Sequence, residues 1–243
     1  QFFLLPALTF TAILIIRPHP SFALGMMMIA ACPGGNVSNF FSKMAKGNVA
    51  LSVSLTAFAT VICLLMTPFN LQFYGGPYEP THAILKTVEL NPFELFKLIL
   101  LILGIPILIG MILNHFYQNV DKKIETVLKP FSMIVFLVLI CIAFYQNIEI
   151  FLEYIYLVAA LVIFHNIGAC AIGFYTAKSF GLKKREQKTI SMETGIQNGG
   201  LGLLLIFQFF DGLGGMALLA AFWGIRDIFS GMLLGIYWGR KND

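Results

Sequence analysis

Long apolar runs dominate the chain and are separated by short polar segments. Eight of these runs approach the roughly 20 residues that a helix needs to cross about 30 Å of hydrocarbon, and most are apolar on every side. No ten-residue segment alternates polar and apolar positions as a membrane-spanning strand does. The pattern therefore predicts an all-α polytopic membrane helix bundle, with runs at residues 1–16, 21–45, 49–69, 92–117, 130–147, 152–177, 187–210 and 213–239.

The composition supports this fold class. Of the 243 residues, 58% are hydrophobic and 12% are charged, whereas a soluble domain carries roughly a quarter charged residues. So little polar surface excludes a soluble enzyme and a disordered protein. The longest connection, about residues 70–91, has the Gly, Pro and Glu residues of an exposed loop, and no separate soluble domain is expected.

Two of the runs cannot be regular helices. The run at 21–45 is interrupted by ACPGGNVSN (31–39), and the run at 187–210 is interrupted by ETGIQNGG (193–200). Proline and glycine disfavour a helix interior, and both interruptions carry polar residues at membrane depth. A pair of Gly/Pro-interrupted segments at corresponding positions is typical of the binding site of a transporter with inverted repeats.

The interruptions also indicate how the repeats are arranged. Residues 1–69 and 152–239 each contain three runs with the interruption in the middle one, and residues 92–147 add two more runs. If those two runs open the second repeat, that repeat has five helices and the two copies are inverted. The first repeat then lacks two helices, and the chain begins with Gln rather than Met. We therefore expect a fragment that shows eight helices of a ten-helix transporter.

The basic residues predict the orientation in the membrane. If each run crosses once, twelve of the 16 Lys and Arg residues fall on one side. The positive-inside rule places that side and the C-terminus in the cytoplasm. The twelve residues are Lys43, Lys46, Lys122, Lys123, Lys129, Lys178, Lys183, Lys184, Arg185, Lys188, Arg240 and Lys241.

Glu193 is the strongest candidate for chemistry, because a carboxylate inside an apolar helix is costly and indicates a functional site. The alternative is a helix that begins at Gln197 and leaves Glu193 among the headgroups, paired with Lys188. If the backbone unwinds before Gln197, the carbonyls of Thr194 and Ile196 become free to face inward. Such oxygen ligands suit a hard, dehydrated cation.

The first interruption and the run that follows it supply further oxygen donors. Ser38 and Asn39 could bind a cation, cap the following half-helix, or do both. Ser52 and Thr56 lie four residues apart on one helical face, so their hydroxyls could point at the same place. Small residues at this spacing also simply permit close helix packing.

Other polar residues suggest an anion site. Asn36 and Asn198 lie at the two interruptions, where half-helix N-termini present N–H groups to a carboxylate or sulfonate. Arg226 and Asp227 could form a structural ion pair or line the cavity. The sequence shows no hydrolase, metalloenzyme, nucleotide-binding or redox-cysteine motif. Basic residues follow no single face, so no nucleic-acid partner is predicted.

Residues 31–69 and the segment SMETGIQNGGL (191–201) resemble the bile acid:sodium symporter family, and the resemblance covers nearly the whole chain. It implies ten helices in two inverted repeats, with residues 1–69 and 152–239 in a core domain and 92–147 in a panel domain. It also implies two sodium ions. The first would be held by Ser38, Asn39, Ser52, Thr56 and Glu193, and the second by Glu193, Gln197, Thr194, Ile196 and Gln1.

By this resemblance the function is sodium-coupled symport of an organic anion such as a bile acid, a steroid conjugate or a small hydroxy or keto acid. The alternatives are proton-coupled transport and a non-transporting ligand sensor of the same fold. Asn36, Asn198 and Asp227 would contact the substrate, although Asp227 places a negative charge beside an anion. The partners are sodium, the anion and membrane lipid. The short loops favour a bacterial inner membrane, and the oligomeric state stays open.

Overall fold

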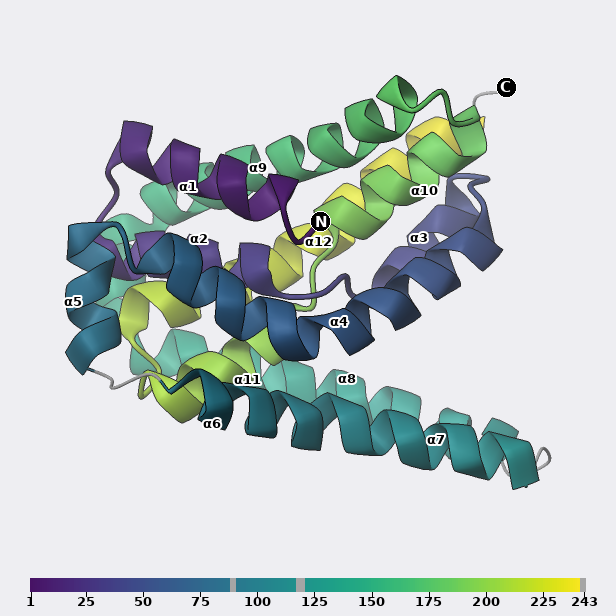
Figure 1. The fold of residues 1–243 in the computed structure, drawn as a ribbon, viewed down its shortest axis with the longest axis horizontal. Helices are drawn as coiled ribbons and strands as arrows, with labels where there is room; N and C mark the ends of the chain where they lie inside the picture. The colour runs from purple at the N-terminus through teal and green to yellow at the C-terminus, as the bar shows by residue number, and fades with distance from the viewer. Residues whose placement is uncertain (88–90, 117–120, 241–243) are drawn as a thin grey trace.

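The computed structural model describes residues 1–87, 91–116 and 121–240, which fold into an all-α bundle (Figure 1). The fold class predicted from the sequence is therefore confirmed. The elements are α1 (Leu4–Ile16), α2 (Pro20–Ala31), α3 (Val37–Met44), α4 (Val49–Gly75), α5 (Glu79–Thr87), α6 (Pro92–Ile99), the π-helical turn η1 (Leu100–Gly104), α7 (Ile105–Phe116), α8 (Asp121–Gln146), α9 (Ile148–Ser179), α10 (Lys184–Gly195), α11 (Gly199–Phe209) and α12 (Gly214–Arg240).

Four helical stretches in the described part of the chain are long and apolar enough to cross a membrane, namely α4, residues 93–110, α9 and α12. Shorter apolar helices are also present, among them α1, α2 and α11. Both predicted interruptions are present, because five residues separate α2 from α3 and three residues separate α10 from α11. The chain is an integral multi-pass membrane protein.

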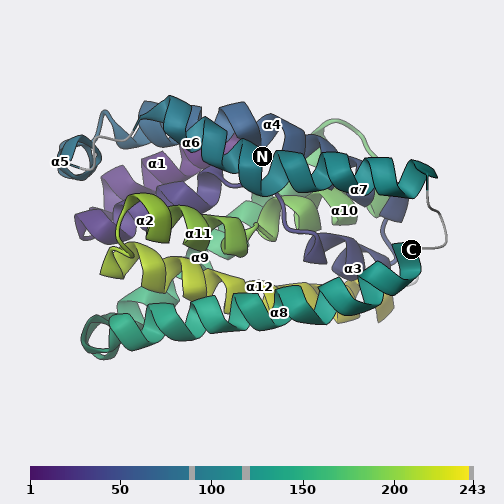
Figure 2. The same cartoon turned by 90° about the horizontal axis from the view of Figure 1, so that it is seen from below.

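Long-range packing brings the two interrupted segments to the centre of the bundle. Helix α10 packs along α9, and α12 contacts α2, α3, α9 and α11. Buried residues such as Phe22, Met28 and Trp223 fill the space between α2 and α12. Figure 2 shows α6 and α7 on one flank and α8 on the other, with α11 and α12 between them.

The expectation of a long loop at about 70–91 is wrong. Helix α4 continues to Gly75, and α5 occupies Glu79–Thr87. The Thr81 side chain donates to the Gly75 carbonyl oxygen and so fastens the start of α5 to the end of α4. Leu85 is 8% exposed and packs toward Gly75, so the apolar residues of this segment form a short helical cap instead of a solvated connection.

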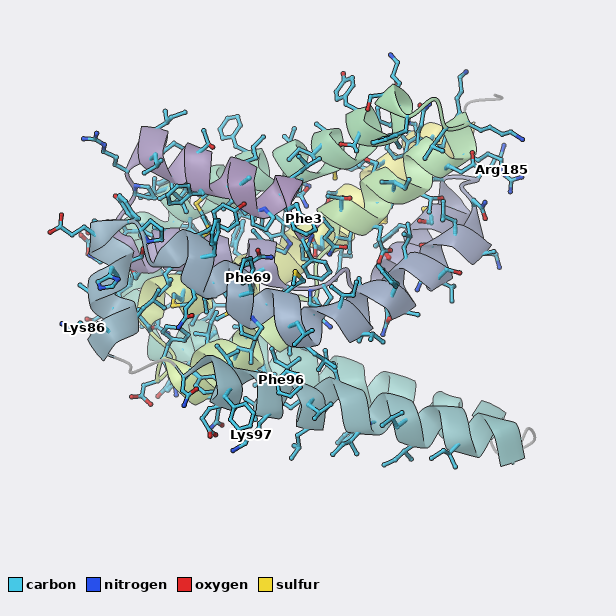
Figure 3. All side chains as sticks on the ribbon, in the orientation of Figure 1. Phe3, Phe69, Lys86, Phe96, Lys97 and Arg185 are labelled. Atoms are coloured by element: carbon cyan, nitrogen blue, oxygen red, sulfur yellow. The ribbon has the colours of Figure 1, made fainter. Side chains whose placement is uncertain are left out.

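The turn between α3 and α4 is fastened to the start of α10. The Asn48 backbone N–H donates to Thr189 Oγ1 at 2.8 Å, and Arg185 Nη2 donates to the Gly47 carbonyl at 3.4 Å. Figure 3 shows Arg185 at one end of the bundle and Lys86 at the other. The end that holds Arg185 also contains the last turns of α3, α9 and α12, which carry basic residues. The cytoplasmic location of this end stays a prediction.

Candidate ion-binding site

The two interrupted segments cross and pair with each other. Gly34 and Gln197 form an isolated antiparallel bridge. The Gly35 N–H donates to the Ile196 carbonyl at 2.9 Å, and the Asn198 N–H donates to the Pro33 carbonyl at 2.8 Å. Backbone groups that leave a helix inside a membrane need partners within the protein. Each interruption therefore supplies partners for the other, which fixes the crossing.

Glu193 lies in the last turn of α10, directly at this crossing, and is 3% exposed. Its Oε2 accepts a hydrogen bond from Ser38 Oγ at 2.5 Å, and its Oε1 accepts one from Thr56 Oγ1 at 2.8 Å. Among the residues that the structure describes, no basic side chain forms an ion pair with Glu193. Glu193 is thus a buried residue within a helix, whereas the alternative interpretation placed it before a helix that begins at Gln197 and paired it with Lys188.

The remaining residues of the first expected site surround Thr56. Its Oγ1 lies 3.4 Å from Asn39 Oδ1 and 3.0 Å from the Ser52 carbonyl oxygen. Ser52 Oγ donates to Ser42 Oγ at 3.2 Å, and both side chains are fully buried. Sequence reasoning missed Ser42. Ser42 lies four residues after Ser38, and this spacing could have placed both side chains on the same face of the helix.

The residues of the second expected site form a chain of hydrogen bonds. Gln1 Nε2 donates to Gln197 Oε1 at 3.0 Å, and Gln197 Nε2 donates to the Thr194 carbonyl at 2.7 Å. The Ile196 carbonyl already accepts from Gly35, although a carbonyl oxygen has a second lone pair. The structure thus brings Gln1, Thr194 and Gln197 together from two distant parts of the chain.

Gly34 makes the close approach of the two segments possible. A Cβ atom at this position would collide with Glu193 Oε1 and would lie 3.1 Å from the Glu193 carbonyl oxygen. Only glycine leaves room for the carboxylate beside the bridge. The PGG sequence is therefore needed for close contact as well as for breaking the helix.

Asn198 and Asn36, the two asparagines expected to bind an anion, occupy different surroundings. Asn198 is the N-cap of α11, where its Oδ1 accepts from the Leu201 N–H at 3.0 Å. It also lines a cavity of about 320 Å³. Asn36 is the N-cap of α3, is exposed and does not line that cavity. The cavity is lined by Ile102, Leu103, Phe131, Val135, Leu139, Asn198, Gly200, Leu201 and Leu204.

Arg226 and Asp227, near the middle of α12, do not form an ion pair in the described part of the chain. Asp227 is 4% exposed, and its Oδ2 accepts from the Gln197 N–H at 3.0 Å. Asn166 Nδ2 donates both to Asp227 Oδ1 at 3.2 Å and to the Gly195 carbonyl at 2.9 Å. Asn166 was not among the site residues predicted from the sequence.

The chemistry of the crossing is that of oxygen donors. Carboxylate, hydroxyl, side-chain amide and backbone carbonyl oxygens lie within hydrogen-bonding distance of one another in a buried location. This donor set fits a hard cation, which prefers oxygen ligands and can be bound by a carboxylate together with neutral hydroxyl and carbonyl oxygens. The residues present therefore fit sodium.

Comparison with known proteins gives one consistent result. The profile of the Sodium Bile acid symporter family matches residues 1–154. An uncharacterized sodium-dependent transporter of Bacillus subtilis is 30% identical over 241 residues, which cover 99% of this chain and 72% of the relative. A probable sodium/metabolite cotransporter, chloroplastic, of Arabidopsis thaliana is 29% identical over 213 residues, or 86% of this chain. The ileal sodium/bile acid cotransporter of Homo sapiens is 27% identical over 203 residues, or 82% of this chain. The chain spans 50% of the plant relative and 55% of the human one.

Proposed function

We propose that this chain, which belongs to the sodium bile acid symporter family, uses the crossing of its two interrupted helices to couple sodium to the movement of an organic anion. The relatives are named as sodium-dependent transporters or cotransporters. The sodium requirement therefore follows the family, and the residues and the substrate assigned below are our proposal.

The observation that carries the proposal is the buried Glu193 carboxylate, which has hydrogen-bond donors but no positively charged partner among the described residues. It is 3% exposed and receives two hydroxyl hydrogen bonds, and no ion pair joins it to a described basic residue. A buried carboxylate without a positive partner is costly. Binding of sodium supplies the missing positive charge.

Two adjoining groups of donors support two sodium ions that share this carboxylate. The first ion would be held by Ser38, Asn39, Ser52, Thr56 and Glu193. The second would be held by Glu193, Gln197, the carbonyls of Thr194 and Ile196, and Gln1. With two ions and a monoanion, one net charge enters per cycle, which is worth about 2.3 kcal/mol for each 100 mV of membrane potential.

The cavity beside the crossing indicates the kind of substrate. Its wall is formed by apolar residues of η1, α8 and α11, and its polar part is Asn198 with the first turn of α11. A helix N-terminus attracts negative charge. We therefore assign the substrate as an amphipathic organic anion whose acidic group lies toward α11 and whose apolar body lies against α8.

The arrangement of helices also supports alternating access. We infer that residues 1–69 and 152–239 form a core that contains the crossing, that 92–147 form the panel, and that the cavity, which both parts line, lies between them. Sodium at the crossing would fix the two interrupted segments relative to each other before the anion binds. The inward sodium gradient would then drive uptake from outside to a cytoplasmic end that carries the excess of Lys and Arg.

Uptake into proteoliposomes tests this function. Radiolabelled taurocholate is offered with an inward sodium gradient, a potassium gradient of equal ionic strength, or a proton gradient alone. We expect accumulation only with sodium, and its loss in Glu193→Ala. The control is Glu149→Gln, which changes an exposed carboxylate at the start of α9. Accumulation driven by protons alone would support proton coupling, and sodium-dependent binding without accumulation would support a sensor.

A further inference from the structure

A second layer of polar residues lies behind the crossing, on the side of α9 and α12. Asn166, in α9, is 1% exposed, and Asp227, in α12, is 4% exposed. Asn166 contacts the last residue of α10, and Asp227 contacts the segment that joins α10 to α11. These contacts are not explained by helix packing alone, since small apolar residues would pack as closely at lower cost.

The contacts involve the two backbone groups that flank Ile196. Asn166 Nδ2 donates to the Gly195 carbonyl at 2.9 Å, and the Gln197 N–H donates to Asp227 Oδ2 at 3.0 Å. Asn166 also donates to Asp227 Oδ1 at 3.2 Å, which joins the two contacts into one unit. One side of the unwound backbone is thereby fixed to α9 and α12.

The carbonyls of Thr194 and Ile196 have different partners from the Gly195 carbonyl. The Thr194 carbonyl accepts from Gln197 Nε2 at 2.7 Å, and the Ile196 carbonyl accepts from the Gly35 N–H at 2.9 Å. Ile196 has φ −103° and ψ 105°, and in such extended backbone successive carbonyls point to opposite sides. Fixing the Gly195 carbonyl therefore directs the Ile196 carbonyl to the opposite side, where Gly35 and the proposed cation ligands lie.

We propose that Asp227 and Asn166 are positioning residues for sodium, which they affect through the backbone of residues 195–197. The inference rests on the proposed function, because it concerns the same site. The sequence predicted that Asp227 contacts the substrate, and we propose the positioning role in its place. Both carboxylate oxygens of Asp227 accept hydrogen bonds from the protein, and Asp227 does not line the cavity. The positioning role also explains an acidic residue near an anion site, since the carboxylate is directed into the core.

The test uses the purified 243-residue chain in detergent. Thermal unfolding is followed as sodium replaces potassium at constant ionic strength, and the sodium concentration that gives half of the stabilisation is determined. The variants are Asp227→Asn, Asn166→Ser and Glu193→Ala. The control is Asp211→Asn, an exposed residue with φ 47° in the turn before α12, where asparagine is well tolerated.

We expect the half-saturating sodium concentration to rise about tenfold or more in Asp227→Asn and in Asn166→Ser, because loss of residues that orient metal ligands typically costs 10–100-fold in affinity. Asp211→Asn should match the parent chain. At saturating sodium, the KM for taurocholate uptake should be unchanged in Asp227→Asn.

The other possible results would refute either the positioning role or the proposed function. Suppose that Glu193→Ala abolishes the sodium response, as the proposed function requires. An unchanged sodium midpoint in both Asp227→Asn and Asn166→Ser, or a raised KM of Asp227→Asn at saturating sodium, would then refute the positioning role. If neither variant folds even in saturating sodium, both residues determine the fold and the positioning role is refuted. An absence of sodium stabilisation in the parent chain would instead refute the proposed function.

Discussion

Ser38 Oγ donates a 2.5 Å hydrogen bond to Glu193 Oε2, although the two residues are 155 positions apart. Ser38 lies in the first turn of α3, just after the first interruption. Glu193 lies in the last turn of α10, just before the second. Both are buried. The bond therefore links the two interrupted segments at the point where the expected sodium ligands meet.

Replacement of Ser38 by alanine should weaken sodium binding. The variant removes one oxygen ligand and one hydrogen bond to a buried carboxylate, and such a bond is worth about 1.5–3 kcal/mol. Since each 1.4 kcal/mol is a factor of ten, the half-saturating sodium concentration should rise about 10- to 100-fold. Sodium-dependent thermal stabilisation measures this change.

The matched control for this variant is Ser179→Ala. Ser179 is the last residue of α9, is exposed, and its Oγ donates to the Thr176 carbonyl of its own helix. Its loss should leave the sodium midpoint as in the parent chain. Equal midpoints for Ser38→Ala and Ser179→Ala would remove Ser38 from the proposed ligand set.

Gly34→Ala should be far more damaging than a glycine-to-alanine change elsewhere in the bundle. The new Cβ would collide with Glu193 Oε1 and approach the Glu193 carbonyl oxygen, and overpacking of this kind costs about 1–3 kcal/mol. We expect a lower thermal midpoint without sodium and a loss of the sodium response, because the carboxylate must move.

Gly110→Ala is the control for this change. Gly110 lies in α7, where a Cβ would meet no atom of the described residues within 4 Å beyond its own stretch of helix, and alanine is the better helix former. The control should be as stable as the parent chain or more stable. If both variants respond to sodium like the parent chain, the close approach of Gly34 to Glu193 is not required for binding.

Features that depend on local composition could be predicted from the sequence. Proline and glycine clusters at membrane depth indicated both interruptions, and Glu193 was identified because a carboxylate is out of place in an apolar run. The helical periodicity also placed Ser52 and Thr56 on one face, and both are buried at the crossing. These signals act over a few residues and need no knowledge of tertiary contacts.

Features that depend on which helices meet could not be predicted. Nothing near Asn166 in the sequence shows that its amide contacts the Gly195 carbonyl 29 residues away. The helix α5 was missed for the same reason, since it is fixed by the contact of Leu85 with the region of Gly75. Gly75, Gly76, Pro77 and Pro80 suggest a loop around the start of α5, and tertiary packing overrides that preference.

The cavity predicts how substrate size affects uptake. Leu204 lines the cavity of about 320 Å³, so Leu204→Trp should fill part of the space that we assign to the apolar body of the anion. We expect the KM for taurocholate to rise about tenfold, which corresponds to roughly 1.4 kcal/mol, and the KM for pyruvate to change less. Initial rates of sodium-driven uptake measure both values.

The control is Leu233→Trp, because Leu233 is 65% exposed on the outer face of α12. This variant should transport both anions like the parent chain. The sodium midpoint should also stay unchanged in Leu204→Trp, since the cavity lies beside the ion ligands and not among them. An equal loss for both anions would contradict the assignment of this cavity to the apolar body.

The orientation predicted from the basic residues can be tested with single cysteines. Lys86 in α5 and Lys183 before α10 are both exposed and flank opposite ends of the bundle. Because the end with the excess of Lys and Arg should be cytoplasmic, a membrane-impermeant maleimide added to intact cells should label Lys86→Cys but not Lys183→Cys. Permeabilised cells should show labelling of both.

The native cysteines set the background for this experiment. Cys32, Cys63 and Cys170 are buried, and Cys141 is exposed on α8, within an apolar stretch that would face lipid. The parent chain should therefore show little labelling by a polar reagent. Labelling of Lys183→Cys in intact cells, with Lys86→Cys protected, would invert the orientation. The proposed direction of sodium-driven uptake relative to the two ends of the bundle would then also be inverted.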